Sequence, residues 1–219
     1  MFLFDVKIII LTAAILAAVY FFAYCYKAAS WTKTAVKTMS VLLLGAAGFI
    51  GGAEGLLIAG LVLSALGDFL LSRDQEPMFL AGVGAFAMAH VTYVILFLTT
   101  PGAGMHHLSS TDWWVILGLL AYGTVMMLAL YKNAGDLRFA VCLYVPIILA
   151  MGVSALMMPG GYLGVTVAAF LFMLSDSVLA SEMFLLRENH PLRRVTPFVI
   201  WSTYWLAQVG FLLAYPVGL

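Results

Sequence analysis

The chain has 219 residues, of which 64% are hydrophobic and 9% are charged, and its mean hydropathy is +1.09. A soluble domain is about 45–50% apolar and about 25% charged, so this composition excludes an ordinary soluble protein and predicts an all-α, multi-pass membrane protein. The net charge is zero, which gives no field to attract nucleic acid. At this length one domain, residues 1–219, accounts for the chain.

Eight apolar segments are candidates for membrane-spanning helices, since a span needs about 20 mostly apolar residues. The segments are Val6–Tyr26, Thr34–Gly51, Glu54–Leu71, Pro77–Thr99, Asp112–Tyr131, Leu137–Met157, Tyr162–Leu186 and Val195–Pro216. Because the connections are short, consecutive helices should pack antiparallel. We therefore expect a bundle of eight transmembrane helices.

All but one of the basic residues fall on the same side of this predicted bundle. Lys7 lies on one side. The other side has Lys27, Lys33, Lys37, Arg73, Lys132, Arg138, Arg187, Arg193 and Arg194. The positive-inside rule makes this second side cytoplasmic. Both termini are then predicted to be non-cytoplasmic, and a bacterial inner or plasma membrane is the simplest location for so compact a chain.

Two aspartates lie inside apolar segments. Asp176 stands near the middle of the segment Tyr162–Leu186, between Ser175 and Ser177, and Asp68 stands about one turn from the cytoplasmic end of its segment. An ionised carboxylate deep in hydrocarbon costs at least a few kcal/mol. Each aspartate should therefore face a polar cavity, hold a partner or stay protonated.

Further polar residues share the cytoplasmic half of the membrane or its middle. They are Ser64, His90, Tyr93, Tyr144, Glu182, Tyr204 and Gln208. Since they come from several segments, we expect one polar cavity between helices, open to the cytoplasm or the inner leaflet. Simpler roles stay open at the helix ends. Asp68 could pair with Arg73, and Glu182 could pair with Arg187.

Several motifs follow one another along the chain. They are Lys37, LGDFLL at Leu66–Leu71, F-x-x-G-x-x-A-F-x-x-x-H-x-x-Y at Phe79–Tyr93, Tyr144, FLFMLSDSVLA at Phe170–Ala180 and TYWLAQ at Thr203–Gln208. In these motifs and their order the chain resembles the YhhN-like lysoplasmalogenase family over most of its length. Thr38 departs from the pattern, because many members have proline there.

The resemblance implies an eight-helix membrane hydrolase, surrounded by membrane lipids, that needs no cofactor. Its substrate would be a lysophospholipid, namely a lysoplasmalogen, which is a 1-alkenyl glycerophospholipid without a second acyl chain. Water would cleave the vinyl ether bond. The products would be a fatty aldehyde and glycerophosphocholine or glycerophosphoethanolamine.

This chemistry requires an acid that protonates the β carbon of the vinyl ether and a base that guides water to the α carbon. Two carboxylates in different environments can supply both, as in glycosidases. We assign Asp176, deeper in the membrane, as the acid and Asp68, nearer water, as the base, and the reverse assignment stays open. Substrate binding is assigned to Lys37, Ser64, His90, Tyr93, Tyr144, Tyr204 and Gln208.

Other kinds of protein also fit these residues. A proton-coupled transporter would use buried Asp and His residues as a relay, although the external halves of the segments are mostly apolar and no internal repeat is visible. A structural protein could use its carboxylates only to join helices. A zinc site of Asp68, His90 and Asp176 is a further alternative, since three protein ligands and a water form catalytic zinc sites. No HExxH-type spacing supports zinc, so we expect no metal.

Overall fold

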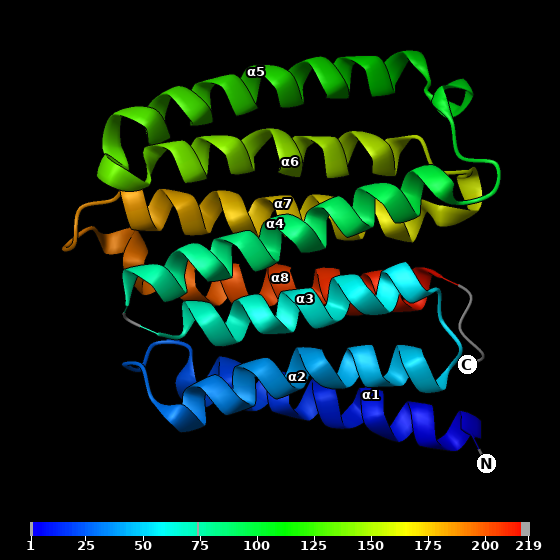
Figure 1. The fold of residues 1–219 in the computed structure, drawn as a ribbon, viewed down its shortest axis with the longest axis horizontal. Helices are drawn as coiled ribbons and strands as arrows, with labels where there is room; N and C mark the ends of the chain where they lie inside the picture. Colours follow the sequence, from blue (N-terminus) through cyan, green and yellow to red (C-terminus); the bar gives the residue numbers. More distant parts are fainter. Residues whose placement is uncertain (1, 74, 216–219) are drawn as a thin grey trace.

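Residues 2–73 and 75–215 are described by a computed structural model, in which they form eight α-helices lying side by side (Figure 1). A π-helix at Tyr20–Tyr24 continues the first of them. The helices are α1 (Phe2–Val19), α2 (Trp31–Ile50), α3 (Gly55–Leu71), α4 (Glu76–Thr99), α5 (Ser110–Asn133), α6 (Arg138–Leu156), α7 (Leu163–Phe184) and α8 (Thr196–Ala214). The prediction of an all-α fold is confirmed for these residues.

Seven of the helices in the described ranges are long and apolar enough to cross a membrane. The chain is therefore a multi-pass membrane protein. The remaining helix, α3, is apolar but has only 17 residues, which corresponds to a length of about 25 Å. That length is at the lower limit for a span.

The predicted segments and the observed helices follow the same order, and they differ mainly at the ends. Helix α2 begins at Trp31, three residues before the predicted start, because the Ser30 side chain accepts a hydrogen bond from the backbone N–H of Lys33 and caps the helix. Apolar runs do not reveal such polar first turns. Pro216, the predicted end of the last segment, lies outside the described residues.

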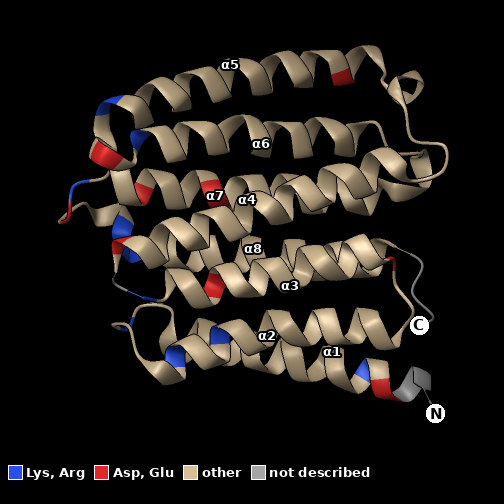
Figure 2. Ribbon diagram, in the orientation of Figure 1, with Lys and Arg blue, Asp and Glu red and all other residues tan. Residues whose placement is uncertain are grey.

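Consecutive helices run in opposite directions, as expected (Figure 1). The pairs α1–α2, α2–α3, α3–α4 and α7–α8 pack against each other, and α6 packs against α4, α5 and α7. Lys and Arg gather at one end of the bundle, where the α1–α2, α3–α4, α5–α6 and α7–α8 connections lie (Figure 2). We call this the charged end. Helix α1 begins at the opposite end, the far end (Figure 1).

Aromatic side chains fill the half of the bundle nearer the far end. The rings of Tyr93, Phe97, Phe172 and Phe211 are fully buried. The ring centroids of Tyr93 and Phe211 are 4.4 Å apart, and those of Phe97 and Phe211 are 5.7 Å apart. The polar residues described below lie between this aromatic cluster and the charged end.

Gly60 tests the close approach of α3 and α4. A Cβ atom added at Gly60 would lie 2.5 Å from the Tyr93 ring, so Gly60→Ala should lower the free energy of unfolding by about 1–3 kcal/mol, as overpacking usually does. Thermal unfolding in detergent measures this loss. Gly84→Ala is the matched control, since an added Cβ atom there meets nothing within 4 Å. Equal melting temperatures for the two variants would contradict the packing described here.

Candidate active site

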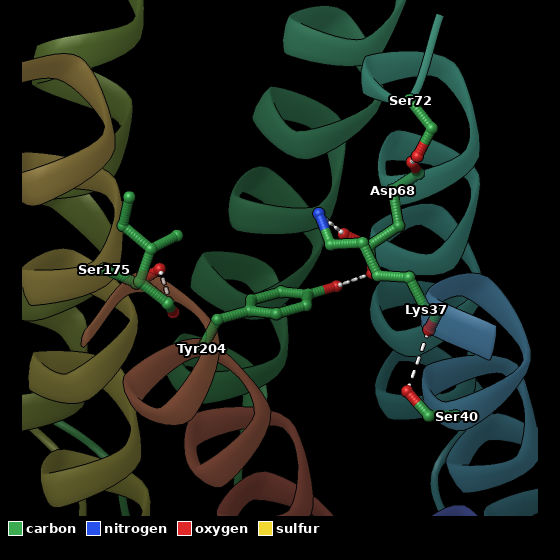
Figure 3. A network of polar contacts seen from close by, with 7 residues as sticks. Lys37, Ser40, Asp68, Ser72, Ser175 and Tyr204 are labelled. Carbon is green, nitrogen blue, oxygen red and sulfur yellow. Dashed lines mark hydrogen bonds and ion pairs between the residues drawn. The ribbon is translucent and has the colours of Figure 1, made fainter. Parts of the chain in front are cut away.

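The carboxylate of Asp68 is fully buried and is held by side chains from two other helices (Figure 3). The Nζ atom of Lys37, on α2, lies 2.8 Å from Oδ1, and the hydroxyl of Tyr204, on α8, donates to Oδ2 at 2.7 Å. Both donors favour the ionised form of Asp68, because hydrogen bonds from donors stabilise a carboxylate. The two contacts therefore stabilise a negative charge at Asp68 against the cost of burying it.

Asp176 has partners of a different kind. The hydroxyl of Tyr144, on α6, donates to Oδ2 of Asp176 at 2.9 Å. The Nε2 atom of His90, on α4, lies 3.3 Å from the same oxygen. The side chain of His90 is fully buried and that of Asp176 is 10% exposed, so the contact between them is screened from water.

The other ring nitrogen of His90 decides what this contact means. Its Nδ1 atom lies 2.6 Å from the backbone carbonyl oxygen of Phe86, so Nδ1 carries a hydrogen and donates it. The Nε2 lone pair would repel an ionised Asp176. A proton between Nε2 and Oδ2 of Asp176 would remove this repulsion, whichever of the two atoms carries it, and would give the buried Nε2 the hydrogen-bond partner that it lacks.

A polar cavity with about 700 Å³ of empty space lies between these two groups and the charged end. Asp68 and Asp176 both line it, and so does Lys37. Its other lining residues are Tyr20, Cys25, Leu71, Phe86, Ser175, Leu179, Glu182, Pro197, Ile200, Trp201 and Tyr204. The two carboxylates singled out from the sequence therefore face one shared space.

An apolar pocket with about 800 Å³ of empty space lies on the other side of Asp176, between α4, α5, α6 and α7. It is lined mainly by hydrocarbon side chains, and Tyr144 and Asp176 also belong to its lining. The apolar pocket and the polar cavity share Leu71, Phe86, Asp176 and Leu179. Asp176 thus stands where an apolar compartment meets a polar one.

The remaining predicted site residues lie elsewhere. Ser64, Tyr93 and Gln208 are fully buried and line neither compartment. The Tyr93 hydroxyl donates a hydrogen bond of 2.8 Å to Oε1 of Gln208. The polar residues predicted to share one cavity are therefore divided. Lys37, Asp68, Asp176 and Tyr204 line the polar cavity, whereas Tyr144 reaches Asp176 from the apolar side.

The helix-end ion pairs considered from the sequence are not formed. Asp68 pairs with Lys37, while the guanidinium of Arg73 donates to the Thr34 hydroxyl and lies 3.9 Å from the centroid of the Trp31 ring. Within the described ranges, Glu182 makes no ion pair with Arg187 or with another basic residue. The same ranges hold no group of three His, Cys, Asp or Glu side chains placed to bind a metal, so the proposed zinc ligands do not converge in this arrangement.

Sequence reasoning missed two features of the site. The first is the pairing of Lys37 with Asp68, although Lys37 lies six residues inside α2 and a lysine at that depth requires a partner. The second is the contribution of Tyr20 and Trp201 to the cavity. No pattern in the sequence marks the two aromatic residues, because most rings in such a chain serve packing.

Comparisons with known proteins give the family of the chain. Residues 31–215 match the YhhN family. Lysoplasmalogenase TMEM86B of Homo sapiens is 35% identical over 187 residues, which cover 82% of this chain and 74% of the human protein. Lysoplasmalogenase TMEM86B of Sus scrofa is 35% identical over 185 residues, with coverage of 82% and 74%. No solved structure matches the chain.

The Lys37–Asp68 pair makes a prediction about stability. Lys37→Met leaves the buried carboxylate without its cation and should lower the free energy of unfolding by about 2–4 kcal/mol, whereas the double variant Lys37→Met/Asp68→Asn should regain part of that loss. Chemical unfolding in detergent measures both changes. Lys33→Met is the control, since Lys33 donates to the backbone carbonyl of Lys27 and forms no ion pair with a described residue. A double variant less stable than Lys37→Met would contradict a direct pair.

Proposed function

The chain belongs to the YhhN family, and we propose that it is a lysoplasmalogenase that hydrolyses the vinyl ether bond of 1-alkenyl glycerophospholipids. The products would be a fatty aldehyde and a glycerophospho-alcohol. The proposal draws on the printed activity of the two mammalian relatives. It also draws on the geometry around Asp176.

The observation that carries the proposal is the meeting of an apolar and a polar compartment at Asp176. A lysoplasmalogen is an amphiphile whose vinyl ether joins the hydrocarbon tail to the glycerophospho head group. A tail in the apolar pocket and a head group in the polar cavity would place this bond beside Asp176.

The first step is protonation of the β carbon. The proton held between Asp176 and His90 is the donor, since either microstate of the pair releases one proton into the site. The transfer breaks the carbon–carbon double bond and leaves an oxocarbenium ion at the α carbon. Tyr144 stabilises the carboxylate that forms on Asp176 by donating to its Oδ2 atom.

The second step adds water to the α carbon. Oδ2 of Asp68 accepts a hydrogen bond from Tyr204 and Oδ1 forms the ion pair with Lys37, and each carboxylate oxygen can accept a further hydrogen bond. A water bound there is oriented, and its proton passes to Asp68 as the new carbon–oxygen bond forms. The hemiacetal then collapses: its hydroxyl loses a proton, the ether oxygen gains one, and the aldehyde leaves. Transfer through cavity water returns the proton from Asp68 to the Asp176–His90 pair.

The other predicted substrate-binding residues have supporting roles in this proposal. Lys37 lies in the polar cavity, where its ammonium has further N–H groups for the head-group phosphate. Tyr204 and Tyr144 fix the two carboxylates. Ser64, Tyr93 and Gln208 lie behind the site, where Tyr93 and Gln208 join α4 to α8 through a buried hydrogen bond.

A proton-coupled transporter is the second candidate. It would require a polar path through the half of the bundle nearer the far end. That half holds the fully buried rings of the aromatic cluster, Tyr93, Phe97, Phe172 and Phe211, which pack against one another. This packing favours an enzyme with a site open on one side.

The proposed topology places the charged end in the cytoplasm, in keeping with the positive-inside rule. Helix α3 would then be the eighth span, short enough to keep Asp68 within one turn of the cytoplasmic surface. Both termini would lie on the opposite side. A cysteine-accessibility assay at the α4–α5 connection would test this arrangement.

Aldehyde release from a purified 1-alkenyl lysophospholipid in detergent tests the reaction. Asp68→Asn and Asp176→Asn should each lower kcat by about 10²–10⁴, the usual contribution of a general acid or base. Asp136→Asn is the matched control, because Asp136 is exposed at the charged end and lines neither compartment. The proposal fails if well-folded wild-type protein releases no aldehyde, or if both site variants keep full activity.

The apolar pocket makes a separate prediction about tail length. Ala180 lines this pocket, so Ala180→Leu takes up space and should lower kcat/KM more for an 18-carbon alkenyl chain than for a 12-carbon chain. Each methylene that loses its place costs about 0.8 kcal/mol, or roughly fourfold. Steady-state rates for both chain lengths measure the ratio. Ala121→Leu, on the exposed face of α5, should leave the ratio unchanged, and an unchanged ratio in Ala180→Leu would argue against a tail in this pocket.

A further inference from the structure

Glu182 is a third carboxylate in the lining of the polar cavity, and neither step of the proposed reaction uses it. It lies on α7, six residues beyond Asp176 towards the charged end, a distance of about 9 Å along the helix axis. Its Oε2 atom is buried and has no hydrogen-bond partner. A buried carboxylate oxygen without a donor is costly, so this position requires an explanation.

Basic residues close to Glu182 in the chain do not supply that partner. The guanidinium of Arg193 donates to the backbone carbonyl oxygens of Glu182, Leu186 and Arg187 rather than to the Glu182 carboxylate. These bonds close the connection between α7 and α8. Lys37, which also lines the cavity, has its ammonium on Asp68. Glu182 therefore presents its carboxylate to the cavity without an ion pair to any described basic side chain.

Aromatic rings line the same cavity as this carboxylate, and each already has a lysine ammonium near it, Lys33 at 5.8 Å from the Tyr20 centroid and Lys37 at 6.0 Å from the Trp201 centroid. Tyr20 and Trp201 line the same cavity, and their ring centroids are 4.3 Å apart. The Trp201 indole is fixed by a hydrogen bond of 3.0 Å to the backbone carbonyl oxygen of Ala17. A carboxylate together with aromatic faces is the combination that binds organic ammonium ions.

We propose that Glu182 binds the ammonium group of the substrate head group and makes the enzyme selective for head groups that carry an amine. This inference rests on the proposed function for the identity of the substrate. The groups of the substrate and the residues of the cavity follow one another in the same order. In the substrate the phosphate lies between the vinyl ether and the amine, and in the cavity Glu182 lies beyond Asp176 towards the charged end. Lys37 then faces the phosphate, and Glu182 faces the ammonium.

Two substrates that differ only in the ammonium test the assignment. They are 1-alkenyl glycerophosphoethanolamine and 1-alkenyl glycerophosphoethanol. Wild-type protein should have about a tenfold lower KM for the first, and Glu182→Gln should raise that KM about tenfold while leaving kcat and the KM for the second unchanged. Glu188→Gln is the control, since Glu188 is exposed in the neighbouring connection and should behave as wild type.

Each other outcome has a definite meaning. Equal changes in KM for both substrates would overturn the proposal and give Glu182 a structural role. A lower kcat with both substrates would overturn it in favour of a role in proton transfer. Unchanged kinetics would also overturn it.

A second experiment distinguishes failure of the proposed function from failure of the proposed ammonium site. If wild-type protein releases aldehyde from neither substrate, equilibrium binding of the corresponding 1-alkyl ether lipids, which cannot be protonated at carbon, tests Glu182 directly. A preference for the ethanolamine lipid that disappears in Glu182→Gln would support the ammonium site without the hydrolase. Equal binding of both lipids to wild-type protein would remove the ammonium site as well.

Discussion

A carboxylate inside a membrane requires a partner, and this constraint organises the bundle. Asp68 on α3 is joined to α2 by Lys37 and to α8 by Tyr204, and Asp176 on α7 is joined to α4 by His90 and to α6 by Tyr144. Two polar groups therefore connect six of the eight described helices. Helices in lipid gain little from burying apolar surface against each other, so these contacts fix their rotation as well as their position. The same contacts place the groups needed for chemistry.

The two halves of the bundle differ in a way that suits an enzyme acting on amphiphiles. Packed aromatic rings close the half nearer the far end, while the half nearer the charged end contains a polar cavity next to an apolar pocket. A substrate with a hydrocarbon tail and a charged head group can satisfy both compartments at once, and a small polar solute can satisfy only one. In the proposed function, the boundary at Asp176 selects the class of substrate and holds the reacting bond.

Much of the fold could be predicted from the sequence, because long apolar runs mark helices in a membrane protein and basic residues mark one end of them. The importance of Asp68 and Asp176 was also evident, since charge in an apolar run is costly. The partners were not evident. Helices α4 and α7 are apolar on nearly every side, so the sequence does not say which face turns inward. Consequently neither the contact between Tyr144 and Asp176 nor the separation of Tyr93 and Gln208 from the cavity could be deduced.

The partners also give an independent reason for the division of roles between the carboxylates. Depth alone suggested that Asp176 is the acid and Asp68 the base, but depth is a weak argument when a cavity admits water. Asp68 faces an ammonium and a phenol, both of which stabilise its charge, whereas Asp176 faces an imidazole whose other nitrogen already donates to a carbonyl. In the proposed mechanism, this arrangement places the available proton on the Asp176 side, whichever atom of that pair carries it. Lys37 would then have a role beyond topology, because its ammonium stabilises the ionised Asp68 that accepts a proton from water.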